Sequence, residues 1–208
     1  EYKPKKVYIS CDGPNLDIEG QKAKVDQTRL LVENSLDWDC DVFKNYSDVN
    51  LGCRDGMSNA IDWFFKQEEE GIILEDDCLP SIEFFEYCDN LLEKYRFNER
   101  IFSISGCNQQ NGIIRGDHSY FFSRYVHVWG WAGWRRSWKY YDKSMSKWQA
   151  FKEFRNIDSF FISKKEKFFW IETFDKLTKF NDPDTWDYQW AFAHFLNDAL
   201  SIIPNKNL

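Results

Sequence analysis

The chain lacks the motifs of several common catalytic classes, and each absence removes a group of functions. It has no Gly-x4-Gly-Lys phosphate loop, no GxGxxG dinucleotide fingerprint, no HExxH zinc motif and no GxSxG nucleophile elbow. Its six cysteines show no CxxC or Cys/His spacing, so no zinc site is predicted. A chain of 208 residues does not need a disulfide framework. We therefore expect a reduced, cytoplasmic setting.

The chain also lacks long apolar runs and an excess of positive charge. No signal peptide and no run of 18 apolar residues is present, so no transmembrane segment is expected. The net charge of -7 argues against a nucleic-acid partner held through phosphates. No internal repeat, low-complexity segment or linker is found. We expect one monomeric domain over residues 1–208, cut from a longer multidomain chain.

Aromatic residues, in contrast, are abundant. The chain contains 10 Trp, 10 Tyr and 19 Phe. Such side chains fill protein cores, and in clefts they stack on sugar rings or bases. Composition alone does not decide between these two uses.

The first half of the chain alternates between buried-strand and helix patterns. Apolar runs bounded by turn residues predict strands at 5–10, 41–46, 71–74 and 101–105, and apolar spacing predicts helices at 21–36, 55–69 and 82–95. This order is typical of an α/β fold with a mixed, mainly parallel sheet flanked by helices. The second half is less regular, with aromatic and glycine residues crowded at 117–141. Helical patterns follow near 146–155, 163–180 and 184–199.

The most informative stretch is the acidic triplet Glu75-Asp76-Asp77, which directly follows the strand at 71–74. In open α/β sheets, ligands bind beyond the carboxyl ends of the strands. Three adjacent carboxylates repel one another, and Mg²⁺ or Mn²⁺ would relieve this repulsion and bridge to substrate phosphates. The triplet predicts a metal–diphosphate site; the alternative is a solvated acidic turn.

Asp187 is the second candidate. Asp184 or Thr185 can cap the helix that follows, which places Asp187 in the first helical turn, where the helix dipole favours an ionised carboxylate. Trp186 and Trp190 flank it on one helix face. Asp187 is either a reactive carboxylate or an ordinary acid at a helix start.

A third candidate is Trp129-Gly130-Trp131, in a run of alternating Trp and Gly that ends in Arg135 and Arg136. Glycine lets the backbone approach a ligand, tryptophan offers a flat apolar face, and arginine can meet phosphate. The alternative is a packed core loop whose arginines pair with acids.

Weaker candidates lie near the first two strands. Arg54, close to a helix start, would suit a diphosphate. Cys11 and Asp12 end the first strand, where a nucleotide base would lie, although Asp12 can equally be a turn residue. Each of the three histidines is a candidate ligand or base, with a structural role as the alternative. They are His118, His127 and His194.

Taken in order, these motifs resemble those of the GT-A glycosyltransferases, which use nucleotide sugars and carry an acidic "DxD" motif after a strand. The similarity is greatest to a bacterial and viral group related to N-acetylglucosaminyltransferase I, and it covers nearly the whole chain. The segments that carry it are Cys11-Asp12-Gly13-Pro14, Asn50-Leu51-Gly52-Cys53-Arg54, Glu75-Asp76-Asp77, Trp129-Gly130-Trp131 and Trp186-Asp187-Tyr188-Gln189-Trp190.

This resemblance implies a GT-A (Rossmann-like) fold and roles for individual residues. Asp77 would bind the metal, Glu75 and Asp76 would face the ribose and sugar, and Asp187 would be the catalytic base. Here Tyr188-Gln189 stands where the relatives have a second Asp, with one residue more before the next Trp. The resemblance further implies Mn²⁺ or Mg²⁺, a UDP-sugar donor, a glycan acceptor and inversion at the anomeric carbon.

Two other functions fit part of the pattern. A metal-dependent phosphohydrolase or nucleotidyltransferase also uses clustered acids, but two-metal sites draw carboxylates from several strands. An inactive domain that binds carbohydrate or nucleotide sugar would keep the aromatic residues without needing Asp187 as a base.

Overall fold

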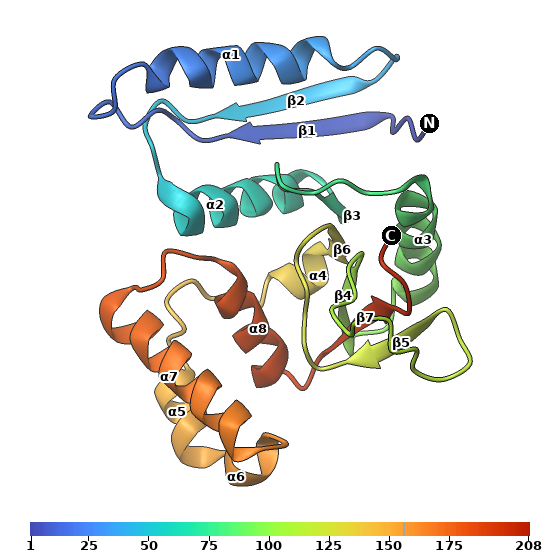
Figure 1. Cartoon of the computed structure of the whole chain (residues 1–208), viewed down its shortest axis with the longest axis vertical. Helices are drawn as coiled ribbons and strands as arrows, with labels where there is room; N and C mark the ends of the chain where they lie inside the picture. The colour runs from blue at the N-terminus through green and yellow to red at the C-terminus, as the bar shows by residue number, and fades with distance from the viewer. Residues whose placement is uncertain (156) are drawn as a thin grey trace. The chain divides into compact units, whose positions relative to one another are not determined.

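The computed structural model of the chain describes residues 1–155 and 157–208. The chain divides into two compact units, residues 1–68 and 69–208, and each is described by itself (Figure 1). The described residues form a mixed α/β structure. The expectation of one domain over the whole chain stays a prediction.

The first unit holds a two-stranded parallel sheet and two helices. β1 (Lys6–Cys11) and β2 (Asp41–Tyr46) pair in parallel, and α1 (Gln21–Asn34) connects them. α2 (Gly52–Gln67) follows. These elements lie where the sequence pattern predicts them, with shifts of a few residues at their ends.

The second unit is built on a five-stranded sheet. Its strands are β3 (Glu70–Ile73), β4 (Ile101–Ser105), β5 (Tyr120–Ser123), β6 (Trp131–Trp134) and β7 (Leu200–Pro204). They lie in the order β3-β6-β4-β7-β5. β4 and β7 pair in parallel, whereas β6 runs antiparallel to both its neighbours and β5 runs antiparallel to β7.

The expectation of a mainly parallel sheet is wrong for this unit, because three of its four strand pairings are antiparallel. The difference comes from β5 and β6, which the sequence reading left inside an irregular aromatic region. β6 consists of Trp131-Ala132-Gly133-Trp134 and is buried along its length. This segment shows no polar–apolar alternation, and it contains a glycine and none of the β-branched residues that mark a buried strand.

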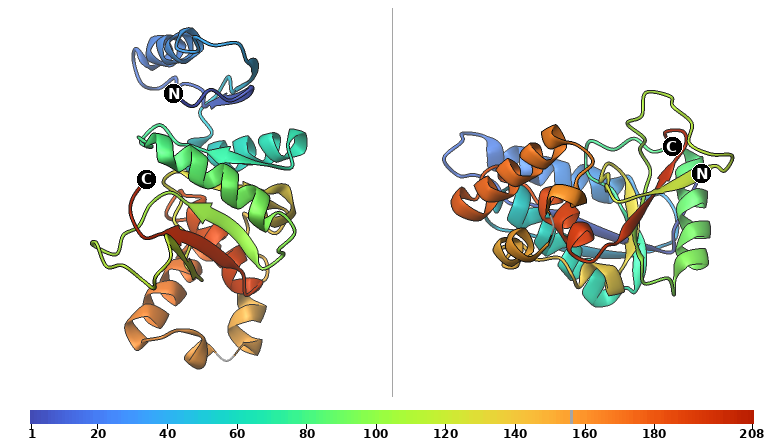
Figure 2. Two further views of the ribbon diagram at one scale, coloured as in Figure 1. Left: turned by 90° about the vertical axis from the view of Figure 1, so that its right-hand side faces the viewer. Right: turned by 90° about the horizontal axis from the view of Figure 1, so that it is seen from below.

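Helices cover both faces of this sheet (Figure 2). α3 (Ile82–Tyr95) packs against β3, β4 and β6, and its inward residues form one core cluster with Ile104, Ala132 and Ile202. On the other face, Phe102 stacks on Trp190 of α8 (Asp187–Leu196). The remaining helices are α4 (Arg135–Trp138), α5 (Trp148–Phe154), α6 (Ile157–Phe160) and α7 (Lys164–Phe180).

A second core cluster joins these helices and is largely aromatic. Trp148, Phe151, Phe174, Phe192 and Phe195 all take part and are buried. α8 lies between the sheet and the helical cluster. One of its faces contacts the sheet, and another contacts α5 and α7. The start of α8, where Asp187 lies, is thereby fixed relative to the sheet.

Candidate functional site

Several strands of the five-stranded sheet end on the same side, which we call the sheet edge. Ile73 of β3 and Ser105 of β4 both pair with Trp131 of β6, so β3 and β4 end where β6 begins. β7 runs parallel to β4 and ends at the same edge. This is the kind of edge at which open α/β sheets bind ligands. The acidic triplet follows β3 directly and therefore lies there.

A pocket of about 350 Å³ opens at this edge. Its wall comes from segments that follow β3 and β4, from the start of β6 and from the last residues of the chain. The polar and aromatic lining residues are Asp77, Cys78, Cys107, Asn108, Gln109, Trp129 and Asn207. The apolar ones include Leu79, Pro80 and Leu208. Asp77 and Trp129, both predicted site residues, thus face one cavity.

Close backbone packing shapes this pocket. The N–H of Gly106 donates to the carbonyl oxygen of Gly130 at 2.7 Å. A side chain at Gly106 would begin 2.6 Å from the ring of Phe84 and 3.0 Å from that same oxygen, so only glycine fits. Gly130 has a φ of 67°, which favours glycine as well. Trp129 is 49% exposed and presents its ring at the pocket.

The acidic triplet and the Trp186-Asp187 pair are distant in sequence but meet at Glu75. The indole N–H of Trp186 donates a hydrogen bond to the carboxyl group of Glu75, and the charge of Asp187 acts on that group. Trp186 is buried and stacks on Trp131 with ring centroids 6.0 Å apart. Trp131 therefore fixes Trp186, and Trp186 in turn orients Glu75.

The electrostatic state of Glu75 reflects this crowding. The pKa of its carboxyl group is raised to about 7, with burial as the largest of several causes. The hydrogen bond from Trp186 lowers that pKa, while the nearby negative charges of Asp77, Asp187 and Asp76, in order of size, raise it further. Carboxylates that repel one another in this way favour the binding of a cation.

Asp187 is the first residue of α8, and Trp186 is its N-cap. The hydroxyl of Thr185 donates a hydrogen bond to Oδ1 of Asp187. The Asp187 carboxylate is half-buried. Burial raises the pKa of the neighbouring Tyr188 hydroxyl, and the negative charge of Asp187 adds a smaller increase. Its position at a helix start agrees with the sequence prediction, and its nearness to Glu75 is added by the structure.

The donor set at this edge fits a hard divalent cation. Asp76 and Asp77 are exposed, and carboxylate oxygens are the ligands that Mg²⁺ and Mn²⁺ prefer. Among the described residues, no three His, Cys, Asp or Glu side chains are arranged to hold a metal by themselves. A cation at Asp77 would therefore need further ligands from outside this set of side chains. Burial raises the pKa of the Cys78 and Cys107 thiols, which keeps them protonated and poor as ligands.

The structure corrects part of the Trp129-Gly130-Trp131 prediction. Trp131 is 1% exposed and lies in the core beneath Trp186, so it does not line the pocket. Arg136 likewise does not meet phosphate: its guanidinium donates to the backbone carbonyls of Tyr95, Arg96 and Ile101. Trp131 fits the core-loop alternative, Arg136 is held by backbone carbonyls and not by the acids which that alternative expected, and Trp129 and Gly130 line the pocket.

The predicted residues Cys11, Asp12 and Arg54 lie in the first unit. The carboxylate of Asp12 accepts hydrogen bonds from the backbone N–H groups of Leu51 and Gly52 and so caps the start of α2. Arg54 pairs with Asp55 at 3.0 Å. This capping role of Asp12 differs from the turn-residue role that the sequence offered as the alternative. A role for these three residues in nucleotide binding stays a prediction.

None of the three histidines is among the residues that line the main pocket. His194 is fully buried, where its Nε2 is 3.0 Å from the hydroxyl of Ser103 and its Nδ1 is 2.9 Å from the carbonyl oxygen of Trp190. His118 is exposed, and His127 is half-buried with a pKa lowered by burial. His194 is therefore part of the core.

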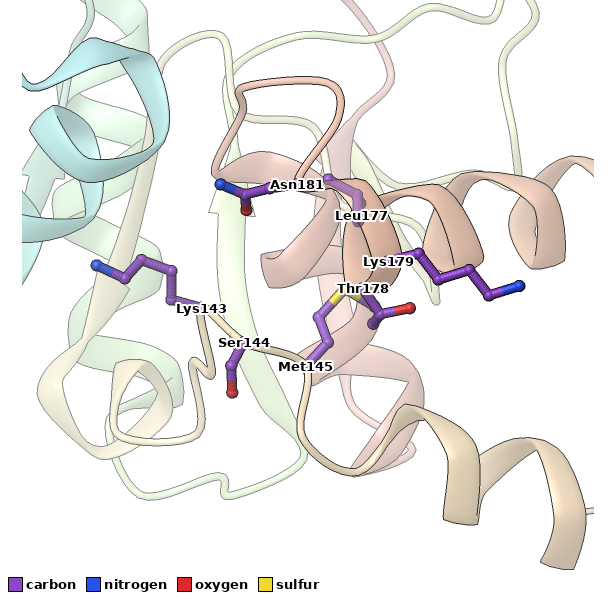
Figure 3. A pocket seen from close by; sticks show the side chains of 7 residues that line it. All are labelled: Lys143, Ser144, Met145, Leu177, Thr178, Lys179 and Asn181. Atoms are coloured by element: carbon purple, nitrogen blue, oxygen red, sulfur yellow. The ribbon is translucent and has the colours of Figure 1, made fainter.

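A second cavity, of about 230 Å³, lies between the segment before α5 and the end of α7. Lys143 and Lys179 border it together with Ser144, Thr178 and Asn181. The two lysine side chains extend away from each other in opposite directions (Figure 3). They do not converge on a common point, so this cavity is not built as an anion site.

Sequence reasoning missed three amide side chains of the main pocket, namely Asn108, Gln109 and Asn207. It also missed the hydrogen bond between Trp186 and Glu75. A local pattern gives no signal for either, because each depends on segments that are distant in sequence.

The comparisons with known proteins add no relative. No protein-family model matches the chain, and no curated protein matches it. Within the described part of the chain, no helix has both the length and the apolar content to cross a membrane.

Proposed function

We propose that the protein is a metal-dependent inverting glycosyltransferase that moves a hexose from a UDP-sugar to a glycan acceptor hydroxyl. The observation that carries this proposal is the meeting of two segments at one sheet edge. The acidic triplet follows β3 beside a pocket, and the Trp186-Asp187 pair at the start of α8 reaches Glu75. The UDP moiety and the GT-A relationship rest on the sequence resemblance.

In this proposal, Asp77 would hold Mn²⁺ or Mg²⁺ at the pocket, where the donor diphosphate binds. When bound, the cation supplies charge stabilisation for the departing nucleoside diphosphate. Glu75, fixed by Trp186, and Asp76 face the ribose and the sugar. Trp129 closes one wall of the pocket and limits access of water, which would otherwise hydrolyse the donor.

Asp187 acts as the general base. It takes the proton of the acceptor hydroxyl as the bond to the anomeric carbon forms and the bond to the diphosphate oxygen breaks. Attack from the face opposite the leaving group inverts the anomeric configuration. The hydrogen bond from Thr185 orients the Asp187 carboxylate for this step.

The pocket lining favours an uncharged sugar. Asp77 is the one charged side chain among the described lining residues, and the others are amide, thiol, aromatic or aliphatic. A sugar carboxylate would find no cationic side chain there and would be repelled by Asp77 unless the metal compensated. Neutral hexoses such as glucose, rhamnose, mannose or N-acetylglucosamine fit this chemistry better than uronic acids.

The decisive test measures donor binding by titration calorimetry. Wild-type protein should bind a neutral UDP-hexose in Mn²⁺, lose this binding in excess chelator, and bind UDP-glucuronic acid more weakly. Asp77→Asn should weaken binding by about tenfold or more, because one charge-assisted metal ligand is lost. Asp117→Asn, which changes an exposed acid outside the pocket lining, is the matched control.

Two outcomes would contradict the proposal. One is unchanged donor affinity in Asp77→Asn or in chelator. The other is release of inorganic phosphate from UDP-sugar as the main product, which would favour the phosphohydrolase alternative.

A further inference from the structure

One end of the second unit exposes large apolar side chains beside lysines. Phe154 is 86% exposed, Ile162 83% and Phe168 68%. Lys164 and Lys165, in the first turn of α7, are exposed as well. We call these five residues the helical tip. Single exposed apolar residues are ordinary, but three at one end, with such high exposure, are not.

Fixed contacts hold the segments of the helical tip together. α6 packs against α7, and Lys167 of α7 forms an ion pair with Asp158 of α6. The backbone N–H of Ile162 donates to Glu166 at 3.0 Å. At the end of α5, the guanidinium of Arg155 lies 4.9 Å from the ring centre of Phe160. Figures 1 and 2 show the end of α5, α6 and the start of α7 side by side.

Charge is distributed unevenly around these helices. Residues 139–180 contain ten Lys or Arg and six Asp or Glu, a net charge of +4 within a chain of net charge -7. The rest of the chain therefore carries -11. Several cations of this segment are paired, for example Lys152 with Asp175. Lys164 and Lys165 begin α7 and lie in sequence between the exposed Ile162 and Phe168.

This combination matches an anionic lipid surface. Aromatic and aliphatic side chains that project from helix ends can enter the boundary between headgroups and acyl chains, while adjacent lysines meet acidic headgroups. The two cavities described above are lined by other residues, so the tip is separate from both of them.

We propose that the helical tip docks the protein on a membrane surface that contains anionic lipid. Phe154, Ile162 and Phe168 enter the interface, and Lys164 and Lys165 contact the headgroups. The binding is peripheral and reversible. It uses none of the residues assigned to the sugar-transfer site and stands independently of that function.

Vesicle co-sedimentation of the whole chain tests the proposal. The probes are vesicles of phosphatidylcholine alone and vesicles of three parts phosphatidylcholine to one part phosphatidylserine. Wild-type protein should bind the mixed vesicles, with binding that weakens as salt rises. Phe154→Ser and Phe168→Ser should each weaken it about tenfold through lost apolar burial. Lys164→Gln with Lys165→Gln should weaken it by about tenfold or more and should flatten the salt dependence.

A matched control lies at the other end of α7. Phe180 is 72% exposed and follows the exposed Lys179, so Phe180→Ser with Lys179→Gln makes comparable changes away from the tip. Circular dichroism and thermal melting verify that each variant is folded. The proposal is overturned if the wild-type protein binds neither kind of vesicle, or binds both equally. It is also overturned if the tip and control variants weaken binding alike, or if the tip captures an acidic protein instead of lipid.

Discussion

At the scale of single residues, Asp187 is the side chain whose loss separates donor binding from transfer. Replacing Asp187 by Asn keeps the size of the side chain and removes the base. We expect donor affinity to stay near wild type, because the proposed metal ligand is Asp77, and turnover to fall by a factor of roughly 10²–10⁴. Paired measurements of donor affinity and transfer rate, with the anomeric configuration of the product, check this.

Asp198→Asn is the matched control for that experiment. Asp198 lies just beyond the other end of α8, is exposed, and has a φ of 49°, a conformation that Asn adopts readily. Wild-type turnover in Asp187→Asn, or a product that keeps the donor's configuration, would leave Asp187 as an ordinary acid at a helix start.

His194 gives a prediction about stability and pH. Burial lowers the pKa of its imidazole from 6.5 to about 4, against a smaller opposing effect of its hydrogen bond to Trp190. As the pH falls below about 6.5, the unfolded chain takes up a proton on His194 before the folded chain does. The free energy of unfolding should therefore fall with decreasing pH, and this contribution should level off below about pH 4.

The full size of this effect is about 3 kcal/mol, and only part of it is reached at pH 5. Urea unfolding between pH 5 and 8 measures it. His194→Gln, which retains hydrogen-bonding groups, should show a shallower decrease of unfolding free energy than the wild-type protein. His118→Gln changes an exposed histidine and should leave the slope as it is. Equal slopes in His194→Gln and wild type would contradict the prediction.

At the scale of elements, Arg136 links α3 to β4. Three of its hydrogen bonds end on the backbone carbonyls of Tyr95 and Arg96, at the end of α3, and of Ile101, at the start of β4. Its guanidinium also lies 4.2 Å from the ring centre of Trp134. Because Arg136→Ala leaves these carbonyls without their charged donor, we expect unfolding to become easier by about 2–4 kcal/mol.

Chemical denaturation of Arg136→Ala against Arg100→Ala checks this expectation. Arg100 is an exposed arginine near the start of β4, so its replacement should change stability little. Similar losses in the two variants would show that Arg136 is not the link between these elements.

The same elements show how far the sequence reading reaches. The strands and helices of residues 1–105 were predicted because each has either a clear apolar run or helical spacing. β5, β6 and β7 were not assigned as strands, and β6 and β7 are almost wholly buried, so their residues show no polar–apolar alternation. Strand order also escaped prediction, because antiparallel insertion of β6 between β3 and β4 depends on long-range pairing.

For the candidate site, the sequence predicts the local setting of each residue but not which of these residues come together in space. A strand followed by three acids, and an acid at a helix start, are visible in sequence, and Asp77 and Asp187 lie in those settings. Nothing local distinguished Trp129, which lines the pocket, from Trp131, which lies in the core. The roles of Trp131 and Trp186 in fixing Glu75 follow from packing between distant segments.

At the scale of the whole molecule, the two units differ in how much apolar surface they bury. In residues 1–68 the buried apolar side chains are Ile9, Ile61 and Phe65, whereas the second unit buries fourteen Trp and Phe side chains besides its aliphatic ones. Every residue of α1 is described and none is buried, while α8 has seven buried residues. Local stability follows such differences.

We therefore expect amide hydrogens of α1 to exchange much faster than those of α8. Burial of apolar side chains is what normally holds a helix of this length together, and α1 has little of it. Hydrogen–deuterium exchange with mass spectrometry at neutral pH compares peptides from the two helices. Fast exchange in α1 with slow exchange in α8 would mean that the first unit opens while the sheet edge carrying Asp77 and Asp187 stays folded. Equal protection of the two helices would contradict this prediction.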